Sequence, residues 1–204
     1  MVLKICGLTN EADAAQAAAA GATMIGVVFA PASPRCVTPD RARDIVEAVP
    51  GDVPVVGVFV NEPIESLVAI VAHSGVRIVQ LHGDEPEAYA AALKVPLLRA
   101  GGVDGGLEAR WPTATLLLDA VSDAQRGGTG TRVDWPKAAA IARRRRVVLA
   151  GGLTPANVAE AIGTVRPFGV DVSSGVEDAP GRKNHEKVAQ FLANARAAFA
   201  AAGL

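Results

Sequence analysis

Two side chains able to transfer protons follow short apolar runs of the sequence, Cys6 in the segment KICG and Asp119 in LLLDA. A thiol followed by glycine can act as a base or a nucleophile if its surroundings lower its pKa from about 8.5. A carboxyl group directly after three leucines is partly removed from water, which favours its protonated form and suits a general acid. Considered singly, Cys6 is equally well explained as an inert buried thiol. The alternative for Asp119 is that it caps the next turn.

Lys4 lies two residues before Cys6, so the two-residue period of a strand points both side chains to the same face. A buried lysine needs a partner of opposite charge, and either Asp119 or Asp171 can supply it. The second cysteine, Cys36, has no evident task. Because two cysteines are too few for a disulfide scaffold, we treat both as free thiols.

Two other polar side chains, Arg35 in SPR and His82 in QLHGDE, also follow apolar runs. The guanidinium of Arg35 can clamp a substrate carboxylate through two parallel hydrogen bonds, although a lone arginine on a loop is more often solvated. His82 can carry a proton or simply line the site. The other histidines, His73 and His185, are expected at the surface, so the sequence predicts no multi-histidine metal site.

The segment 146–176 has the pattern of an anion site. It reads as a strand ending in Gly151-Gly152, an amphipathic helix, and a second strand ending in Ser173-Ser174-Gly175. Two parallel strands end at the same edge, where glycine-freed amides, serine hydroxyls and the N-terminus of a short following helix suit a phosphate. The glycine-rich stretch 127–130, which includes Gly130, could fold over a substrate and add further amides. The alternative is two ordinary strand-to-helix turns, since Gly and Ser are common there.

The elements that must position these residues repeat one pattern, a strand followed by a helix. Strands are expected at 3–6, 24–29, 55–60, 76–81, 96–100, 115–119, 147–149 and before Ser173. Helices are expected at 10–20, 39–49, 63–74, 85–93, 134–143, 153–168 and 184–202, with a short or irregular one after the fifth strand. Asn10 and Thr38 are candidate N-caps. Eight such units of roughly 25 residues predict an α/β fold, a single-domain (β/α)₈ TIM barrel over residues 1–204.

This fold class fixes where the chemistry should lie, because barrel enzymes place it at the C-terminal ends of their strands. A doubly wound open sheet is the competing architecture, but no GxGxxG motif follows the first strand. We find no linker or domain boundary in the chain.

Composition excludes several classes of partner. Half of the 204 residues are hydrophobic, and 20 Lys and Arg nearly balance 21 Asp and Glu, so no polyanionic partner such as nucleic acid is indicated. Four consecutive arginines at 143–146 are expected to form the solvated C-terminal end of a helix. No apolar run approaches the ~20 residues that span a bilayer, and the N-terminus lacks a signal-peptide layout. We therefore expect a cytoplasmic protein that does not contact membranes, either a monomer or a homodimer.

Taken together, the motifs resemble one family. The segments KICG, ASPR, VGVFVN, QLHGDE, LLLD, GGTGTRVDW, LAGGL, DVSSGVE and PGRK resemble those of phosphoribosylanthranilate isomerase, a barrel enzyme of tryptophan biosynthesis, in the family's order and spacing from residue 3 to about 192. The departures are small. Cys36 follows SPR at a variable position, and Asn184 follows PGRK where aspartate is more usual.

The resemblance implies a role for each candidate residue. Cys6 would be the general base, Asp119 the general acid, and Arg35 the residue that holds the anthranilate carboxylate. The remaining candidates would bind the phosphate or line the pocket: Gly130, Gly151, Gly152, Ser173, Ser174 and Gly175 for the phosphate, His82 and Asp171 for the lining.

The reaction that the resemblance implies is the Amadori rearrangement of N-(5-phosphoribosyl)anthranilate to 1-(2-carboxyphenylamino)-1-deoxyribulose 5-phosphate. The partner is a small phosphosugar, and no cofactor or metal is needed because the substrate nitrogen is the electron sink. The reaction requires Cys6 as a thiolate while Asp119 is still protonated, so the pocket must shift the pKa of at least one of them.

Two other functions compete with this reading. A pentose-phosphate epimerase would share the phosphate site but needs several His and Asp metal ligands. A non-catalytic barrel that binds phosphometabolites would have no reason to keep both Cys6 and Asp119.

Overall fold

Strands and helices alternate along the chain in the computed structural model, which describes residues 1–104, 106–120 and 133–204. The strands are β1 (Val2–Cys6), β2 (Met24–Val28), β3 (Val55–Phe59), β4 (Ile78–Leu81), β5 (Leu97–Gly101), β6 (Thr115–Leu118), β7 (Val147–Leu149) and β8 (Gly169–Val172). The helices are α1 (Glu11–Ala19), α2 (Pro39–Ala48), α3 (Ile64–Ser74), α4 (Tyr89–Ala92), α5 (Leu107–Arg110), α6 (Trp135–Ala142), α7 (Val158–Val165) and α8 (His185–Ala202). Between β8 and α8 lie a 3₁₀ helix, η1 (Ser174–Val176), and a hairpin of β9 (Glu177–Ala179) and β10 (Arg182–Lys183).

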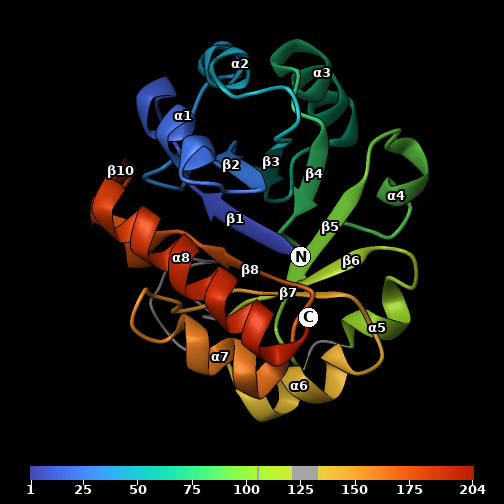
Figure 1. Cartoon of the computed structure of the whole chain (residues 1–204). Coiled ribbons are helices and arrows are strands. Elements are labelled where there is room, and N and C mark those ends of the chain that lie inside the picture. The colour runs from blue at the N-terminus through green and yellow to red at the C-terminus, as the bar shows by residue number, and fades with distance from the viewer. Residues whose placement is uncertain (105, 121–132) are drawn as a thin grey trace.

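The eight strands close into a parallel barrel, and the helices form a ring around it (Figure 1). Closure comes from β8 pairing with β1, where Lys4 stands opposite Asp171. On the other edge of β1, Cys6 stands opposite Gly26 of β2. The predicted (β/α)₈ barrel is therefore confirmed, and the open-sheet alternative is wrong.

Alternate residues of β1 face opposite sides of the barrel wall. Leu3 and Ile5 belong to the large core between the strands and the helices. Val2 belongs instead to a separate cluster with Leu117 and Val148, which packs inside the barrel. By the same alternation Lys4 points inward with Cys6, as the strand period predicts.

Local sequence signals set where the helices begin. The Asn10 side chain accepts a hydrogen bond of 2.8 Å from the backbone N–H of Asp13 at the start of α1. Thr38 caps α2 in the same way, with Pro39 at the first helical position. Both predicted caps are confirmed. No helix in the described part of the chain is long and apolar enough to cross a membrane.

The helix expected at 153–168 begins only at Val158. The Asn157 side chain accepts a hydrogen bond from the N–H of Thr154 and donates one to the carbonyl of Gly152, which holds the preceding residues in a turn.

Two further parts of the chain differ from the prediction. The helix expected at 85–93 is reduced to α4, because the Glu85 side chain turns inward and accepts hydrogen bonds from the backbone N–H groups of Asn61 and Gly83 at 2.8 and 2.9 Å. The segment 86–91 then forms turns with bonds between residues three apart. The second difference is the β9–β10 hairpin, which the sequence analysis does not predict.

Candidate functional site

A small cavity opens at the C-terminal ends of the strands, with a volume of about 90 Å³. The sequence-predicted residues that line it are Cys6, Arg35, His82, Asp119, Asp171 and Ser173. Six candidates from five separate segments thus meet at one place, as expected for the mouth of a barrel.

Cys6 ends β1, and its thiol lies in the space that Gly26 leaves open. A Cβ atom on Gly26, the neighbour on β2, would lie 2.7 Å from the Cys6 sulfur, so no larger residue fits beside the thiol. Gly7 has φ +75°, and a Cβ there would lie 2.5 Å from the Arg35 side chain. Burial raises the pKa of the Cys6 thiol, while the Lys4 ammonium acts against that shift.

Lys4 is fully buried and forms an ion pair of 3.0 Å with Asp171. Burial disfavours the ammonium form, but the charges of Asp171 and Cys6 more than offset it, and the pKa of Lys4 is raised. Lys4 is therefore a cation inside the barrel, next to the thiol. Of the two partners that the sequence allows, the structure selects Asp171.

Asp119 follows β6, and its carboxyl group is almost removed from water, with 12% of the side chain exposed. One oxygen accepts a hydrogen bond of 2.8 Å from the N–H of Ala120, and the other lies 3.5 Å from Nε2 of His82. Burial, with a smaller contribution from the charge of Asp171, raises the pKa of Asp119 to about 6. The carboxyl group thus keeps its proton far more readily than an ordinary aspartate.

Gln80, which the sequence analysis missed, lies beside His82 in the cavity. Its Nε2 is 3.4 Å from Nδ1 of His82, and its buried carbonyl oxygen has no hydrogen-bond partner among the described residues. Gln80 lies on β4, two residues before His82. Residues two apart on a strand share a face, so this spacing could have predicted that Gln80 lines the cavity.

The two predicted glycine and serine loops lie side by side. Gly151 and Gly152 both have positive φ, of 78° and 66°. A Cβ atom on Gly175 would lie 1.9 Å from the carbonyl oxygen of Leu153, so η1 packs directly on the loop after β7. A Cβ on Gly151 would lie 3.0 Å from an oxygen of Asp119, which places this loop next to the carboxyl group. Gly130 and the 127–130 stretch lie outside the described residues.

Arg35 reaches the cavity from the loop after β2, but its guanidinium is already engaged. Nε and Nη2 donate to the two carboxylate oxygens of Glu177 at 2.8 and 2.6 Å. The hydrogen bonds to Glu177 raise the pKa of Arg35. Glu177 also pairs with Lys183. Both residues lie in the motifs DVSSGVE and PGRK, but the sequence does not predict their contacts.

Metal ligands do not gather at the site. Over residues 1–104, 106–120 and 133–204, no group of three or more His, Cys, Asp or Glu side chains could hold a metal ion.

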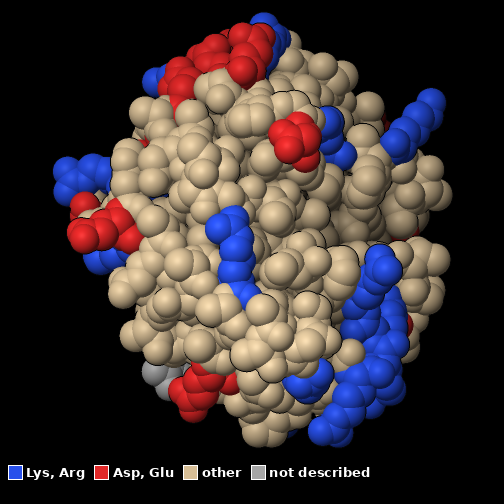
Figure 2. Space-filling view, in the orientation of Figure 1, with Lys and Arg blue, Asp and Glu red and all other residues tan. Residues whose placement is uncertain are grey.

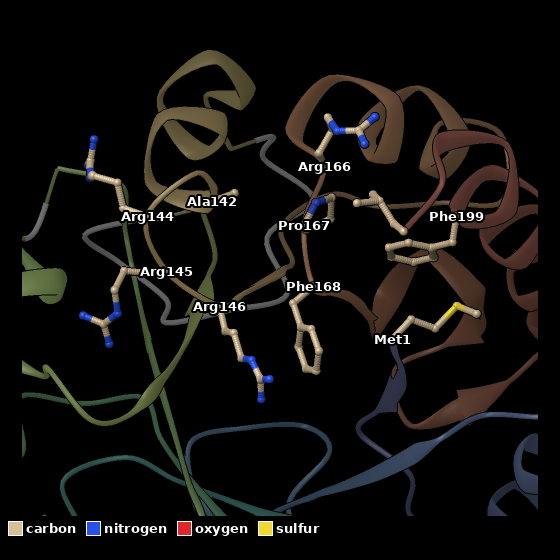
Figure 3. Close-up of a pocket in the computed structure, with 10 residues that line it drawn as sticks. Met1, Ala142, Arg144, Arg145, Arg146, Arg166, Pro167, Phe168 and Phe199 are labelled. Atoms are coloured by element: carbon tan, nitrogen blue, oxygen red, sulfur yellow. The ribbon is translucent and has the colours of Figure 1, made fainter.

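A second, larger cavity of about 470 Å³ lies at the opposite end of the barrel, and its lining includes Met1, Pro167 and Phe168 (Figure 3). Lys and Arg side chains gather on this face on the side of α5 and α6 (Figure 2). Arg144 pairs with Glu108 at 2.7 Å, and the Arg146 guanidinium lies 4.9 Å from the centre of the Phe168 ring. Arg145 instead donates to three backbone carbonyls, so this part of the arginine run is not simply solvated as expected.

Comparison with known proteins agrees with this geometry. The sequence model of the family described as N-(5'phosphoribosyl)anthranilate (PRA) isomerase matches residues 3–194. The N-(5'-phosphoribosyl)anthranilate isomerase of Pelobacter propionicus is 45% identical over 194 residues, covering 93% of each chain. The crystal structure of phosphoribosyl anthranilate isomerase from Thermotoga maritima superimposes with a TM-score of 0.88 at 40% identity, covering 97% of this chain and 100% of the other.

A further solved structure holds a ligand. It is a phosphoribosyl anthranilate isomerase in complex with reduced 1-(o-carboxyphenylamino)-1-deoxyribulose 5-phosphate, with a TM-score of 0.85 at 38% identity, covering 97% of this chain and 100% of that one. The chain therefore belongs to the N-(5'-phosphoribosyl)anthranilate isomerase family and is an isomerase of tryptophan biosynthesis.

Proposed function

We propose that Asp119 and Cys6 perform the isomerisation of this family as general acid and general base. The substrate is N-(5-phosphoribosyl)anthranilate, and the product is 1-(2-carboxyphenylamino)-1-deoxyribulose 5-phosphate. The observation that carries the assignment is a carboxyl group with its pKa raised to about 6, facing the same small cavity as a buried thiol. An acid and a base on one pocket are the two groups that this rearrangement needs.

Asp119 acts first in this scheme. Its proton passes to the ribose ring oxygen, the bond from that oxygen to C1 breaks, and the nitrogen lone pair forms an iminium ion with C1. With a pKa of about 6 instead of the usual value near 4, Asp119 is protonated in a much larger fraction of molecules near neutral pH.

Cys6 then removes the proton from C2. The electron pair of the broken C2–H bond forms the C1–C2 double bond, the C1–N π pair returns to nitrogen, and the resulting enolamine tautomerises to the ketone. In the protein without substrate, burial raises the pKa of Cys6 and so opposes the thiolate. Two cations favour it: the ammonium of Lys4, and the iminium ion that forms beside the thiol in the preceding step. The order of events follows, because opening the ring creates the charge that helps to ionise the base.

Arg35 and the two loops bind the two ends of the substrate in this proposal. The guanidinium takes the anthranilate carboxylate, which it suits by its paired N–H groups. The adjoining loops, Gly151-Gly152 and 173–175, offer amides and hydroxyls to the phosphate, and His82 and Asp171 line the space between. The cytoplasmic location expected from the sequence stays a prediction.

A fluorescence assay of the disappearance of freshly generated substrate, with no metal added, tests both roles. Cys6→Ser and Asp119→Asn should each lower kcat by roughly 10²–10⁴. Cys36→Ser is the matched control, because Cys36 is an exposed thiol, and it should turn over like the parent. An active Cys6→Ser or Asp119→Asn enzyme would remove that residue from the mechanism, and an inactive but folded parent would favour a barrel that binds phosphosugars without chemistry.

A further inference from the structure

Glu177 lies at the centre of a buried cluster of charges behind the barrel mouth, and its side chain is 4% exposed. Beyond its two bonds from Arg35, it accepts one of 2.6 Å from Nζ of Lys183 and one of 3.4 Å from the N–H of Gly181. Lys183 has no exposed side-chain surface and also donates to the carbonyl of Ser173, in the loop proposed to bind phosphate. The cluster therefore joins Arg35 to the phosphate end of the site.

The cluster is held in a fixed position by the β9–β10 hairpin, which carries both Glu177 and Lys183. Gly181, with φ +79°, forms the turn, and its carbonyl accepts a hydrogen bond of 2.6 Å from Thr9 in the loop after β1. The backbone N–H of Lys183 donates to Asp13, which in turn contacts His185 at 2.7 Å. The hairpin is thus tied to α1 and α8, so Glu177 cannot move without breaking these contacts.

Glu177 uses only one edge of the Arg35 guanidinium. The side edge, Nε and Nη2, faces Glu177, whereas Nη1 donates no hydrogen bond to any described residue. A guanidinium offers a second pair of parallel N–H groups at its end edge, from Nη1 and Nη2. We propose that Glu177 is a positioning residue, which holds Arg35 by its side edge so that the end edge receives the substrate carboxylate. This inference rests on the proposed function, because it needs a substrate with a carboxylate.

The charges of the cluster allow this arrangement. Arg35 and Lys183 both pair with the one carboxylate of Glu177, and of the two only Arg35 lines the cavity. Lys183 neutralises Glu177, and an incoming carboxylate therefore meets little repulsion. What Glu177 supplies is orientation, since a free arginine side chain loses much rotamer freedom when a ligand fixes it.

The Glu177→Gln/Lys183→Met double variant separates orientation from charge, because it removes one anion and one cation and leaves the total unchanged. Its affinity should be measured by calorimetry for reduced 1-(o-carboxyphenylamino)-1-deoxyribulose 5-phosphate and for the same compound without the ring carboxylate. We expect the carboxylate ligand to bind roughly tenfold more weakly than to the parent. Lys183→Met also removes the hydrogen bond to the Ser173 carbonyl, which affects both ligands alike, so Lys183→Met alone is measured as the reference for that part. The ligand without the carboxylate should bind the double variant as it binds Lys183→Met.

Asp178→Asn is the matched control, since Asp178 is the next residue on the same strand, exposed and paired with Lys187 at 3.4 Å. It should bind both ligands like the parent. In an Arg35→Met background, adding Glu177→Gln to Lys183→Met should cause no further loss, because Glu177 acts through Arg35. Compared with Lys183→Met, equal weakening of both ligands, unchanged affinity for both, or a further loss without Arg35 would each overturn the proposal.

The single Glu177→Gln variant leaves Lys183 buried without its anion, and a thermal melt shows whether it still folds; the charge-balanced double variant keeps the test valid if it does not. The proposed function is tested separately. If the parent binds the carboxylate ligand but does not isomerise the substrate, the catalytic assignment fails while the role of Glu177 is still decided by the two affinities.

Discussion

The two ends of the barrel carry cavities of opposite character. The mouth cavity is about 90 Å³ and is lined by buried groups that can ionise, among them Cys6, Asp119 and Asp171. The far cavity is about 470 Å³, and its arginines pair with surface acids, backbone carbonyls or an aromatic ring. The larger cavity is not the one suited to chemistry.

What separates the two ends is how far each charge is removed from water. Lys4 at the mouth is fully buried against Asp171, whereas 59% of the Arg144 side chain at the far end is exposed. Burial strengthens electrostatic interactions and shifts pKa values, and both effects fade at an exposed site. The difference agrees with the general division of barrel enzymes, with chemistry at one face and stability at the other.

The largest stability effect is expected where a buried charge loses its partner. Lys4→Met leaves Asp171 buried without its cation, which should lower the free energy of unfolding by about 3–5 kcal/mol. In a Cys36→Ser background, with one thiol left, the pKa of Cys6 should also rise, because the Lys4 charge lowers it. Chemical denaturation and the ultraviolet absorbance of the thiolate measure the two effects.

A matched pair of variants sharpens this prediction. Lys137 forms an ion pair of 2.9 Å with Asp104, but both side chains are more than half exposed. Lys137→Met should therefore lower the stability far less than Lys4→Met does. Asp171→Asn added to Lys4→Met should restore much of the lost stability, because no lone charge remains. An unchanged thiol titration in Lys4→Met would show that Lys4 does not act on Cys6.

The second largest effect on stability is expected at Asp119, because its pKa is raised in the folded protein. A carboxyl group that binds its proton more tightly in the folded state stabilises the fold below its unfolded pKa, and this contribution is lost as the pH rises through about 6. Asp119→Asn removes the cost of the buried charge. The variant should be more stable than the parent by roughly 2–3 kcal/mol at pH 8, with no difference at pH 4.

Denaturant unfolding at several pH values tests this prediction. Cys6→Ser is the control, because the pKa of Cys6 is raised above its ordinary value and the thiol stays neutral from pH 4 to 8. Its stability difference from the parent should not vary over that range. A difference between Asp119→Asn and the parent that is independent of pH would mean that Asp119 is ionised normally in the folded protein.

The residues at strand ends were predictable because their positions follow from local patterns. Cys6 and Asp119 end apolar runs, and parallel strands of a barrel bring such ends together whatever the details of packing. The two-residue period likewise placed Lys4 beside Cys6. The choice between Asp119 and Asp171 as its partner was beyond the sequence, because it depends on the register in which β8 closes against β1.

The cluster around Glu177 was not predictable for a different reason. Strands β9 and β10 have three and two residues, too few to show a period of two. The contact between Arg35 and Glu177 joins residues 142 positions apart, and no local pattern reports it. The shortening of the helix expected at 85–93 was also hidden from local patterns. The hydrogen bonds that Glu85 accepts override the helical preference of the segment.

The smallest effect is expected at the far end. Arg146→Ala removes the contact of the guanidinium with Phe168, which at an exposed site contributes about 0.5–1 kcal/mol to stability. Because the groups proposed to be catalytic lie at the other end of the barrel, kcat/KM should equal that of the parent. Phe168→Leu removes the same contact and should lower the stability by a similar amount. The double variant should lose less stability than the sum of the two single variants, because both changes remove one shared contact. A fall in kcat/KM in either variant at full folding would show that the two ends are coupled, and the division between them would no longer hold.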